Sequence, residues 1–123
     1  MKYLCLAYYD AERFAALPAA ERDALVSRCP PYDAALRASG HLVAQASLGP
    51  ASATASVRPR DGGASMTDGP FTETKEQVGG FFIVEAKDLN EAIRAASLHP
   101  AAHLGGEVGW GVEVRPIEHF EQY

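Results

Sequence analysis

The segment Lys2–Tyr9 limits the folds open to this chain more than any other part of the sequence. Its residues alternate as in a β-strand, with Tyr3, Cys5, Ala7 and Tyr9 on one face and Leu4, Leu6 and Tyr8 on the other. Both faces are largely apolar, which is typical of a central strand covered on both sides. Any fold adopted by the chain must therefore bury two faces of this strand.

Two helical segments are expected. Pro18 is suited to begin the first, which ends at Gly40 and carries one apolar stripe, Leu25, Cys29, Tyr32 and Leu36. Pro30-Pro31 interrupts it, and because an interior proline costs roughly 3 kcal/mol, we expect a break near Cys29. The second helix begins after an Asp88 cap with Glu91 three residues on. Its expected buried stripe is Leu89, Ile93 and Ala96.

Further alternating or apolar segments predict strands at His41–Leu48, Ala53–Arg58, Ala64–Thr67, Phe81–Ala86 and Trp110–Ile117. In the first of these, Leu42, Ala44, Ala46 and Leu48 should share one face. Asp61-Gly62-Gly63 is typical of a hairpin turn. The order resembles two split βαβ halves, which predicts one α+β domain over residues 1–123. We expect a ferredoxin-like sandwich, an antiparallel sheet with two helices on one face.

Helices on one face alone would leave Leu4, Leu6 or Tyr8 in water. An exposed apolar sheet face of that size indicates an interface. The sequence therefore predicts a homodimer that packs sheet to sheet, with a ligand pocket near the interface.

Composition excludes several classes of function. Among 123 residues, 47% are hydrophobic and the net charge is −5, with no basic stripe, which argues against binding nucleic acid. No phosphate-binding glycine motif or serine-hydrolase elbow is present, so no cofactor is expected. The N-terminal apolar run is too short to span a membrane, so a cytoplasmic protein is expected. Cys5 and Cys29 are expected to be buried thiols, with a disulfide as the alternative.

The stretch Met66–Ile83 combines features that rarely occur together. Asp68-Gly69-Pro70 predicts a turn, a polar segment follows it, and Gly79-Gly80 leads into an apolar strand. Long polar connections of this kind tend to be functional or disordered.

This stretch resembles the signature of DGPF-domain proteins, members of the YciI-like (YCII-related) family. The resemblance includes Asp68-Gly69-Pro70-Phe71, Thr72–Glu76 and Gly79-Gly80-Phe81, and extends over nearly the whole chain. It implies a dimeric α+β barrel. It also implies a His–Asp pair. The histidine of that pair falls elsewhere in the family pattern, so the pair is not assigned to residues of this sequence.

Six residues are candidates for a site. Asp68 could be a turn former or a pocket base, and His41 a strand-end residue or a general acid–base group paired with Asp68 or Asp33. The other four are candidate substrate-binding residues, Tyr8, Glu73, Lys75 and Arg115. Their ordinary alternatives are core packing for Tyr8, a solvated loop for Glu73 and Lys75, and a surface ion pair for Arg115. His99 and His103 are four residues apart, but Pro100 prevents a continuous helix between them, so no metal site is expected.

Two functions stay open. One is a cofactor-free acid–base enzyme acting on a small anionic molecule, with Asp68 or His41 as base and Lys75 or Arg115 as anion clamp. The other is a non-catalytic ligand-binding or regulatory module, because the resemblance implies an association with sigma-factor signalling. A purely structural role for the motif is a third possibility.

Overall fold

The computed structural model describes residues 1–123, and its main sheet has four strands in the order β2-β5-β1-β6. Every neighbouring pair is antiparallel. The strands are β1 (Lys2–Asp10), β2 (Leu42–Ser47), β5 (Glu76–Glu85) and β6 (Gly111–Pro116). The predicted α+β class and antiparallel sheet are confirmed. Strands from the two halves of the chain alternate in the sheet, so β1 is central as its two apolar faces predict.

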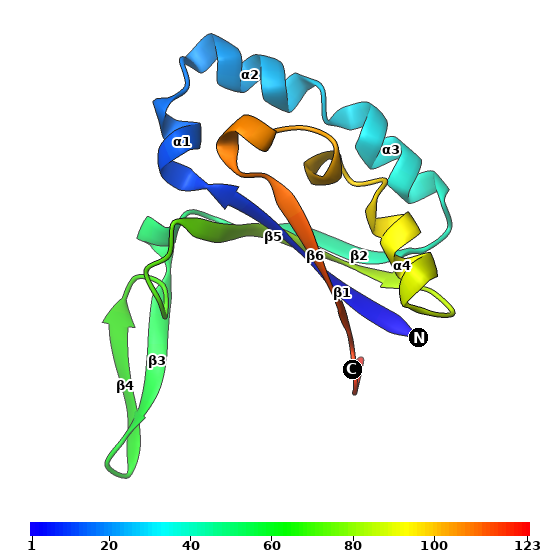
Figure 1. Ribbon diagram of the computed structural model, residues 1–123. Helices are drawn as coiled ribbons and strands as arrows, with labels where there is room; N and C mark the ends of the chain where they lie inside the picture. The colour runs from blue at the N-terminus through cyan, green and yellow to red at the C-terminus, as the bar shows by residue number, and fades with distance from the viewer.

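All helices lie on one side of this sheet (Figure 1). They are α1 (Ala11–Ala16), α2 (Ala19–Ser27), α3 (Pro30–Ala38) and α4 (Leu89–Ala96). The predicted break near Cys29 is confirmed, because α3 begins at Pro30, where a helix needs no backbone N–H. The stripe predicted for this segment is also confirmed, since Leu25 and Leu36 are buried. No helix in the structure is both long enough and apolar enough to cross a membrane.

The predicted buried stripe of α4 is wrong in part, since Ala96 is buried as expected but Leu89 and Ile93 are not. Leu89 and Ile93 are 47% and 45% exposed, and the helix turns its small residues toward the sheet, Ala92, Ala95 and Ala96. Small side chains let a helix approach a sheet closely, and this displaces the larger ones to its flank. Asp88 caps the helix as expected, since its Oδ1 accepts from the Glu91 N–H at 2.8 Å.

The face pattern predicted for β2 is also wrong in part. The pairing with β5 shifts between Leu42 and Ala44, so that Val43 has no partner and forms a bulge. A bulge reverses the alternation that follows it. Leu42 therefore packs on the helix side, whereas Ala44 and Ala46 pair with Ile83 and Phe81 on the opposite face.

The chain between β2 and β5 forms a separate two-stranded sheet. After the short 3₁₀ helix η1 (Ala51–Ala53), β3 (Ala55–Arg60) and β4 (Gly63–Asp68) pair only with each other. This hairpin extends from the main sheet on the side away from the helices (Figure 1). The predicted turn at Asp61-Gly62 is confirmed. The strand predicted from Ala53 begins at Ala55, because Ala51–Ala53 forms η1, and the strand predicted at Ala64–Thr67 is longer by one residue at each end.

The core between helices and sheet has two parts. The larger consists of Tyr3, Cys5, Leu36, Phe82, Val84, Ala86, Ala92, Ala95 and Ala96. The smaller lies under α1 and α2, beside the 3₁₀ helices η2 (Pro100–Ala102) and η3 (Gly106–Val108), and consists of Leu25, Leu104 and Val108. Both cysteines are free thiols, and burial raises the pKa of Cys5 to about 11, so this thiol stays protonated at neutral pH.

The other face of the main sheet has no helix over it. Leu4 and Leu6 point to this side with their cross-strand partners Ile83 and Phe81, and all four are partly exposed. The sheet is open, since β2 and β6 are its two edges and no strand joins them. A single chain therefore does not close a barrel.

Candidate functional site

A cavity of about 550 Å³ lies on the helix side of the sheet, beside both parts of the core. Its floor is a row of small residues on three neighbouring strands, because Ala7 pairs with Gly80 and Gly80 pairs with Ser47. Larger side chains at these positions would fill the space. The cavity therefore follows from residue size along one row of the sheet.

Two adjacent glycines bring the strands close together beneath this cavity. A Cβ on Gly80 would lie 2.8 Å from the backbone oxygen of Ala46, so only glycine allows this approach of β5 to β2. The pairing of β1 with β5 shifts between Ala7 and Tyr8, which leaves Gly79 as a bulge covered by the Tyr9 ring. Gly79-Gly80 therefore shapes the cavity floor.

His99 lines this cavity, and its ring is fixed by two contacts. The ring stacks on Phe82, with centroids 4.6 Å apart and planes at 3°. Its Nδ1 accepts from the Ala101 N–H at 3.0 Å, which caps η2. A neutral histidine that accepts at Nδ1 carries its proton on Nε2. Because Nε2 has no hydrogen bond to the protein and is not sealed off from solvent, its N–H is available to a ligand.

The His99 ring is held in the neutral form. Burial lowers its pKa below the ordinary value of 6.5, and the negative charge of Asp33 opposes this shift. Asp33 is half-buried on α3 and lines the same cavity. The cavity thus combines a neutral imidazole donor with a carboxylate, the two groups needed to polarise an oxygen and to remove a proton. Its walls include the aromatic side chains of Tyr9, Phe14 and Trp110.

A second, wider cavity of about 1190 Å³ lies between the base of the hairpin and the end of the main sheet. Its polar lining includes Tyr8, Thr72, Thr74, Glu76 and Glu113. Neither cavity is lined by a lysine or an arginine. This lining argues against the small anionic ligand expected from the sequence, because nothing in it would neutralise a negative charge.

The Asp68-Gly69-Pro70-Phe71 motif closes the base of the hairpin by bonding to the start of β3. Gly69 has φ +95°, its N–H donates to Thr54 O at 2.6 Å, and its carbonyl accepts from the buried Ser56 hydroxyl at 2.7 Å. Arg58 stacks over the Phe71 ring at 3.8 Å. Asp68 is exposed at the end of β4. These contacts support a structural role for the motif.

Asp10 was missed as a candidate, although it is the most deeply buried carboxylate. Its side chain is 4% exposed, and its Oδ1 accepts from the Arg13 N–H at 3.1 Å as the cap of α1. Its Oδ2 lies 3.5 Å from Arg13 Nε and 3.9 Å from Lys75 Nζ. Lys75 therefore connects the polar motif to the end of β1 and does not line either cavity.

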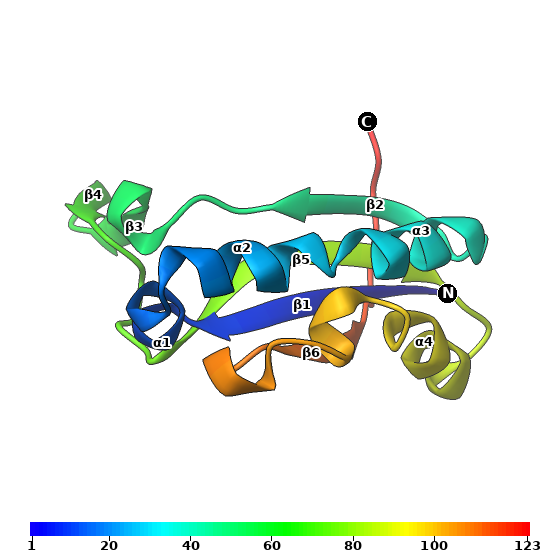
Figure 2. The same cartoon turned by 90° about the horizontal axis from the view of Figure 1, so that it is seen from above.

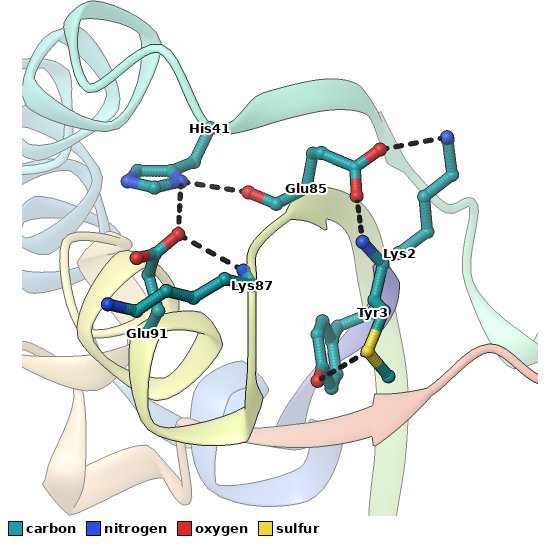
Figure 3. A network of polar contacts seen from close by, with 7 residues as sticks. Lys2, Tyr3, His41, Glu85, Lys87 and Glu91 are labelled. Atoms are coloured by element: carbon teal, nitrogen blue, oxygen red, sulfur yellow. Dashed lines mark hydrogen bonds and ion pairs between the residues drawn. The ribbon is translucent and has the colours of Figure 1, made fainter.

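His41 lies at the other end of β5 from the motif, in a separate polar network (Figure 3). Its Nδ1 is 2.8 Å from the Glu85 carbonyl and 3.9 Å from Glu91 Oε1. The Glu85 carboxylate bonds the N-terminal amine and Lys2, and these bonds lower its pKa. His41 contacts the Glu85 end of β5, whereas Asp68 ends β4 in the hairpin before the other end of β5, so the structure does not bring them together.

The other candidates lie outside the helix-side cavity, except Tyr8, which lines both cavities. The Tyr8 hydroxyl donates to Glu113 Oε2 at 3.5 Å, and Arg115 Nε donates to the same oxygen at 3.0 Å. This links two candidates through a residue that the sequence did not suggest. Glu73 is exposed in the loop before β5. No group of three or more residues is arranged to hold a metal ion.

His99 and Asp33 were named in the sequence but not as a pair. Asp33 is on α3, and His99, 66 positions later, is at the start of η2. Only the fold brings them to one cavity. The sequence contains one weak signal for His99. It directly precedes Pro100, and the residue before a proline that starts a helical turn is often the one whose side chain caps that turn.

Comparison with known proteins is consistent with the resemblance seen in the sequence. A family model described as YCII-related domain matches residues 1–121. An uncharacterised protein of Rhizobium meliloti (strain 1021) is 37% identical over 79 residues, which are 64% of this chain. The chain covers 61% of the length of that relative.

Proposed function

Starting from the membership of this chain in the YCII-related domain family, we propose that it is a cofactor-free acid–base enzyme whose site is the helix-side cavity. The observation that carries the proposal is the state of His99. Its Nδ1 accepts a hydrogen bond from a backbone N–H, so the neutral ring carries its proton on Nε2, and the residue lines a cavity that Asp33 also lines.

We assign the two groups different roles on the basis of this arrangement. His99 donates a hydrogen bond to a carbonyl oxygen and stabilises the negative charge that develops there. Asp33 removes the proton from the adjacent carbon. A histidine whose Nδ1 accepts a backbone bond is a poor base, so the carboxylate takes that role. The reaction class is proton abstraction next to a carbonyl, as in an isomerase or a lyase.

The cavity also restricts the substrate. A volume of about 550 Å³ suits a small molecule. Its lining combines aromatic rings with Gln45, Ser47 and one carboxylate, and has no cationic side chain. An uncharged, partly apolar carbonyl compound therefore suits it better than an anion.

The proposal is tested by hydrogen exchange at carbon. A panel of small uncharged ketones and lactones is incubated with the protein in D₂O, and loss of the α-proton signals is followed by ¹H NMR. We expect exchange of at least one compound. Asp33→Asn and His99→Asn should each slow it by about 10²–10⁴-fold, the usual contribution of a positioned acid or base.

Matched controls separate this site from the earlier candidates. His41→Asn and Asp68→Asn should leave the exchange rate unchanged, because neither residue lines the cavity. Exchange that depends on His41 or Asp68, and not on Asp33, contradicts the proposal. Binding of a panel compound without any exchange would favour the non-catalytic ligand-binding function.

We also propose that the protein is a homodimer in which the two helix-free sheet faces pack together, as in a dimeric α+β barrel. The support is an apolar row on the sheet face that carries no helix of the same chain, formed by Leu4, Leu6, Phe81 and Ile83. Two such faces packed about 10 Å apart would bury both rows.

A further inference from the structure

The polar segment Thr72–Glu76 presents only some of its side chains to the wide cavity at the base of the hairpin. Those that line the cavity carry oxygen atoms and are Thr72, Thr74 and Glu76. Glu73 and Lys75 do not line it, so the side chains alternate with the two-residue period of an extended chain. Lys75 instead lies near Asp10, with its Nζ 3.9 Å from Oδ2. The segment therefore turns hydroxyl and carboxylate groups toward the cavity and its one cation away from it.

The wide cavity lies at the end of the sheet where β1 leads into α1. Figure 2 shows the hairpin at this end of the molecule and α4 at the other. The sheet narrows to two strands here, because β6 pairs along β1 only as far as Tyr8 and β2 pairs along β5 only as far as Gly80. The connection from β2 to the hairpin, the polar segment and the start of β6 line the space that remains. The cavity thus occupies the room left by the two shorter strands.

Three aromatic rings line this cavity, those of Tyr8, Phe71 and Trp110. Arg58 covers one face of the Phe71 ring at 3.8 Å, yet Phe71 is still 59% exposed, so its other face is open. The Trp110 indole packs against Gly105, where a Cβ would overlap the ring, and the Trp110 N–H donates to the Gly105 carbonyl at 3.0 Å. Aromatic rings held in this way offer flat apolar surfaces for the C–H groups of a ligand.

The Glu113 carboxylate is held with one oxygen engaged and the other free. Its Oε2 accepts from the Tyr8 hydroxyl at 3.5 Å and from Arg115 Nε at 3.0 Å. Its Oε1 has no hydrogen-bond partner in the chain and is not sealed off from solvent. Arg115 balances the charge of Glu113 without lining the cavity. The free oxygen therefore suits a neutral hydroxyl donor better than a cation, whereas an anion would meet no lysine or arginine in the lining.

We propose that the wide cavity is a second binding site, for an uncharged ligand that carries several hydroxyl groups on a ring, such as a hexose or its glycoside. Hydroxyls of this ligand donate to the carboxylates of Glu76 and Glu113 and exchange hydrogen bonds with Thr72, while its C–H groups pack on the aromatic rings. A cavity of about 1190 Å³ has room for one sugar ring with a further substituent. The inference does not rest on the acid–base chemistry proposed for the helix-side cavity.

Trp110 is the one tryptophan of the chain and lines this cavity, so its fluorescence reports directly on binding. The protein is titrated with the methyl and phenyl glycosides of glucose, galactose and mannose, and with choline and inorganic phosphate as a cationic and an anionic probe. We expect at least one glycoside to change the emission saturably, while choline and phosphate leave it unchanged. Excitation at long wavelength keeps the tyrosines and the phenyl groups silent.

Variants assign the signal to the wide cavity. Glu113→Gln keeps the size of the side chain and removes its charge, so the dissociation constant of the glycoside should rise about tenfold. Thr72→Val removes one hydroxyl from an exposed loop and should raise the constant about threefold to tenfold. Glu73→Gln is the matched control, because it makes the same chemical change in the same segment at a side chain that does not line the cavity. It should leave the constant unchanged, and circular dichroism checks that every variant is folded.

The possible outcomes distinguish this site from the helix-side cavity, which Trp110 also lines. Asp33→Asn should not alter the affinity for the glycoside. A glycoside signal that Asp33→Asn abolishes and Glu113→Gln does not places the ligand in the helix-side cavity and overturns the proposal. A panel in which no glycoside changes the emission, or in which choline binds more tightly than every glycoside, overturns it as well. None of these results affects proton exchange at carbon, which tests the acid–base function separately.

Discussion

His99 owes its properties to the Phe82 ring, to a backbone N–H and to its burial. Phe82 orients the ring, the Ala101 N–H fixes the proton on Nε2, and burial keeps the ring neutral. None of these can be read from the residue's identity. His41, which looked better placed at the start of a strand, instead bonds the Glu85 carbonyl.

The lowered pKa of His99 predicts a pH dependence of stability. The unfolded chain takes up a proton at this residue near pH 6.5, whereas the folded chain does so only at lower pH, so between the two values the unfolded state binds more protons. This contribution is complete above about pH 6.5 and declines as the pH falls. His99→Asn keeps an acceptor for Ala101 and removes the titration, so the variant should lose less stability than the unchanged protein between about pH 7 and about pH 5.

Urea denaturation at several pH values measures this difference. Equal slopes for His99→Asn and the unchanged protein would show that the ring titrates alike in both states.

Gly80→Ala tests the close approach of β5 to β2. The new Cβ would meet the Ala46 oxygen at 2.8 Å. Because the Cβ is attached directly to one paired strand and the oxygen belongs to the backbone of the next, neither can move freely. Overpacking of this kind costs about 1–3 kcal/mol of unfolding free energy. Gly49→Ala meets no atom within 4 Å and should change the free energy by less than about 0.5 kcal/mol. Equal effects of the two changes in chemical denaturation would refute this account.

Among the elements, helix ends were predicted better than helix faces. Proline at the start of α3 and Asp88 before α4 act through the local backbone, so their effect is visible in the sequence. The choice between Leu89 and Ala92 as the buried residue of α4 depends on how near the helix lies to the sheet. That distance is set by contacts between segments.

The cap at Asp10 gives a prediction at this scale. Asp10→Ala removes the bond to the Arg13 N–H and should destabilise the protein by about 0.5–2 kcal/mol, the usual value of an N-cap. Asp10→Asn keeps an acceptor for that bond and loses only the attraction of Arg13 and Lys75, which are largely exposed. It should therefore cost less than alanine. Thermal denaturation of both variants checks the order, and an asparagine as harmful as alanine would assign the main effect to the charge.

For the whole molecule, the helix-free sheet face predicts the state of association. Leu6→Lys places a charge in the middle of this face, opposite Glu113 of the neighbouring strand, so one chain can accommodate it. We expect the variant to sediment as a folded monomer at micromolar concentration while the unchanged protein is a dimer. Val26→Lys, on the helix side, should remain dimeric. A dimeric Leu6→Lys variant would place the interface elsewhere.

The order of strands and helices, the break at Pro30 and the central place of Lys2–Tyr9 were accessible from the sequence, because periodicity, proline geometry and helix caps act within a few residues. The membership in a family was accessible for the same reason, since its motif is a continuous stretch. The site was not. Asp33, His99 and the small residues Ala7, Ser47 and Gly80 come from five segments of the chain, and their meeting depends on the pairing register of β1, β5 and β2. The bulges at Val43 and Gly79 set that register, and a bulge is stabilised by what packs on both strands, which no single segment of sequence contains.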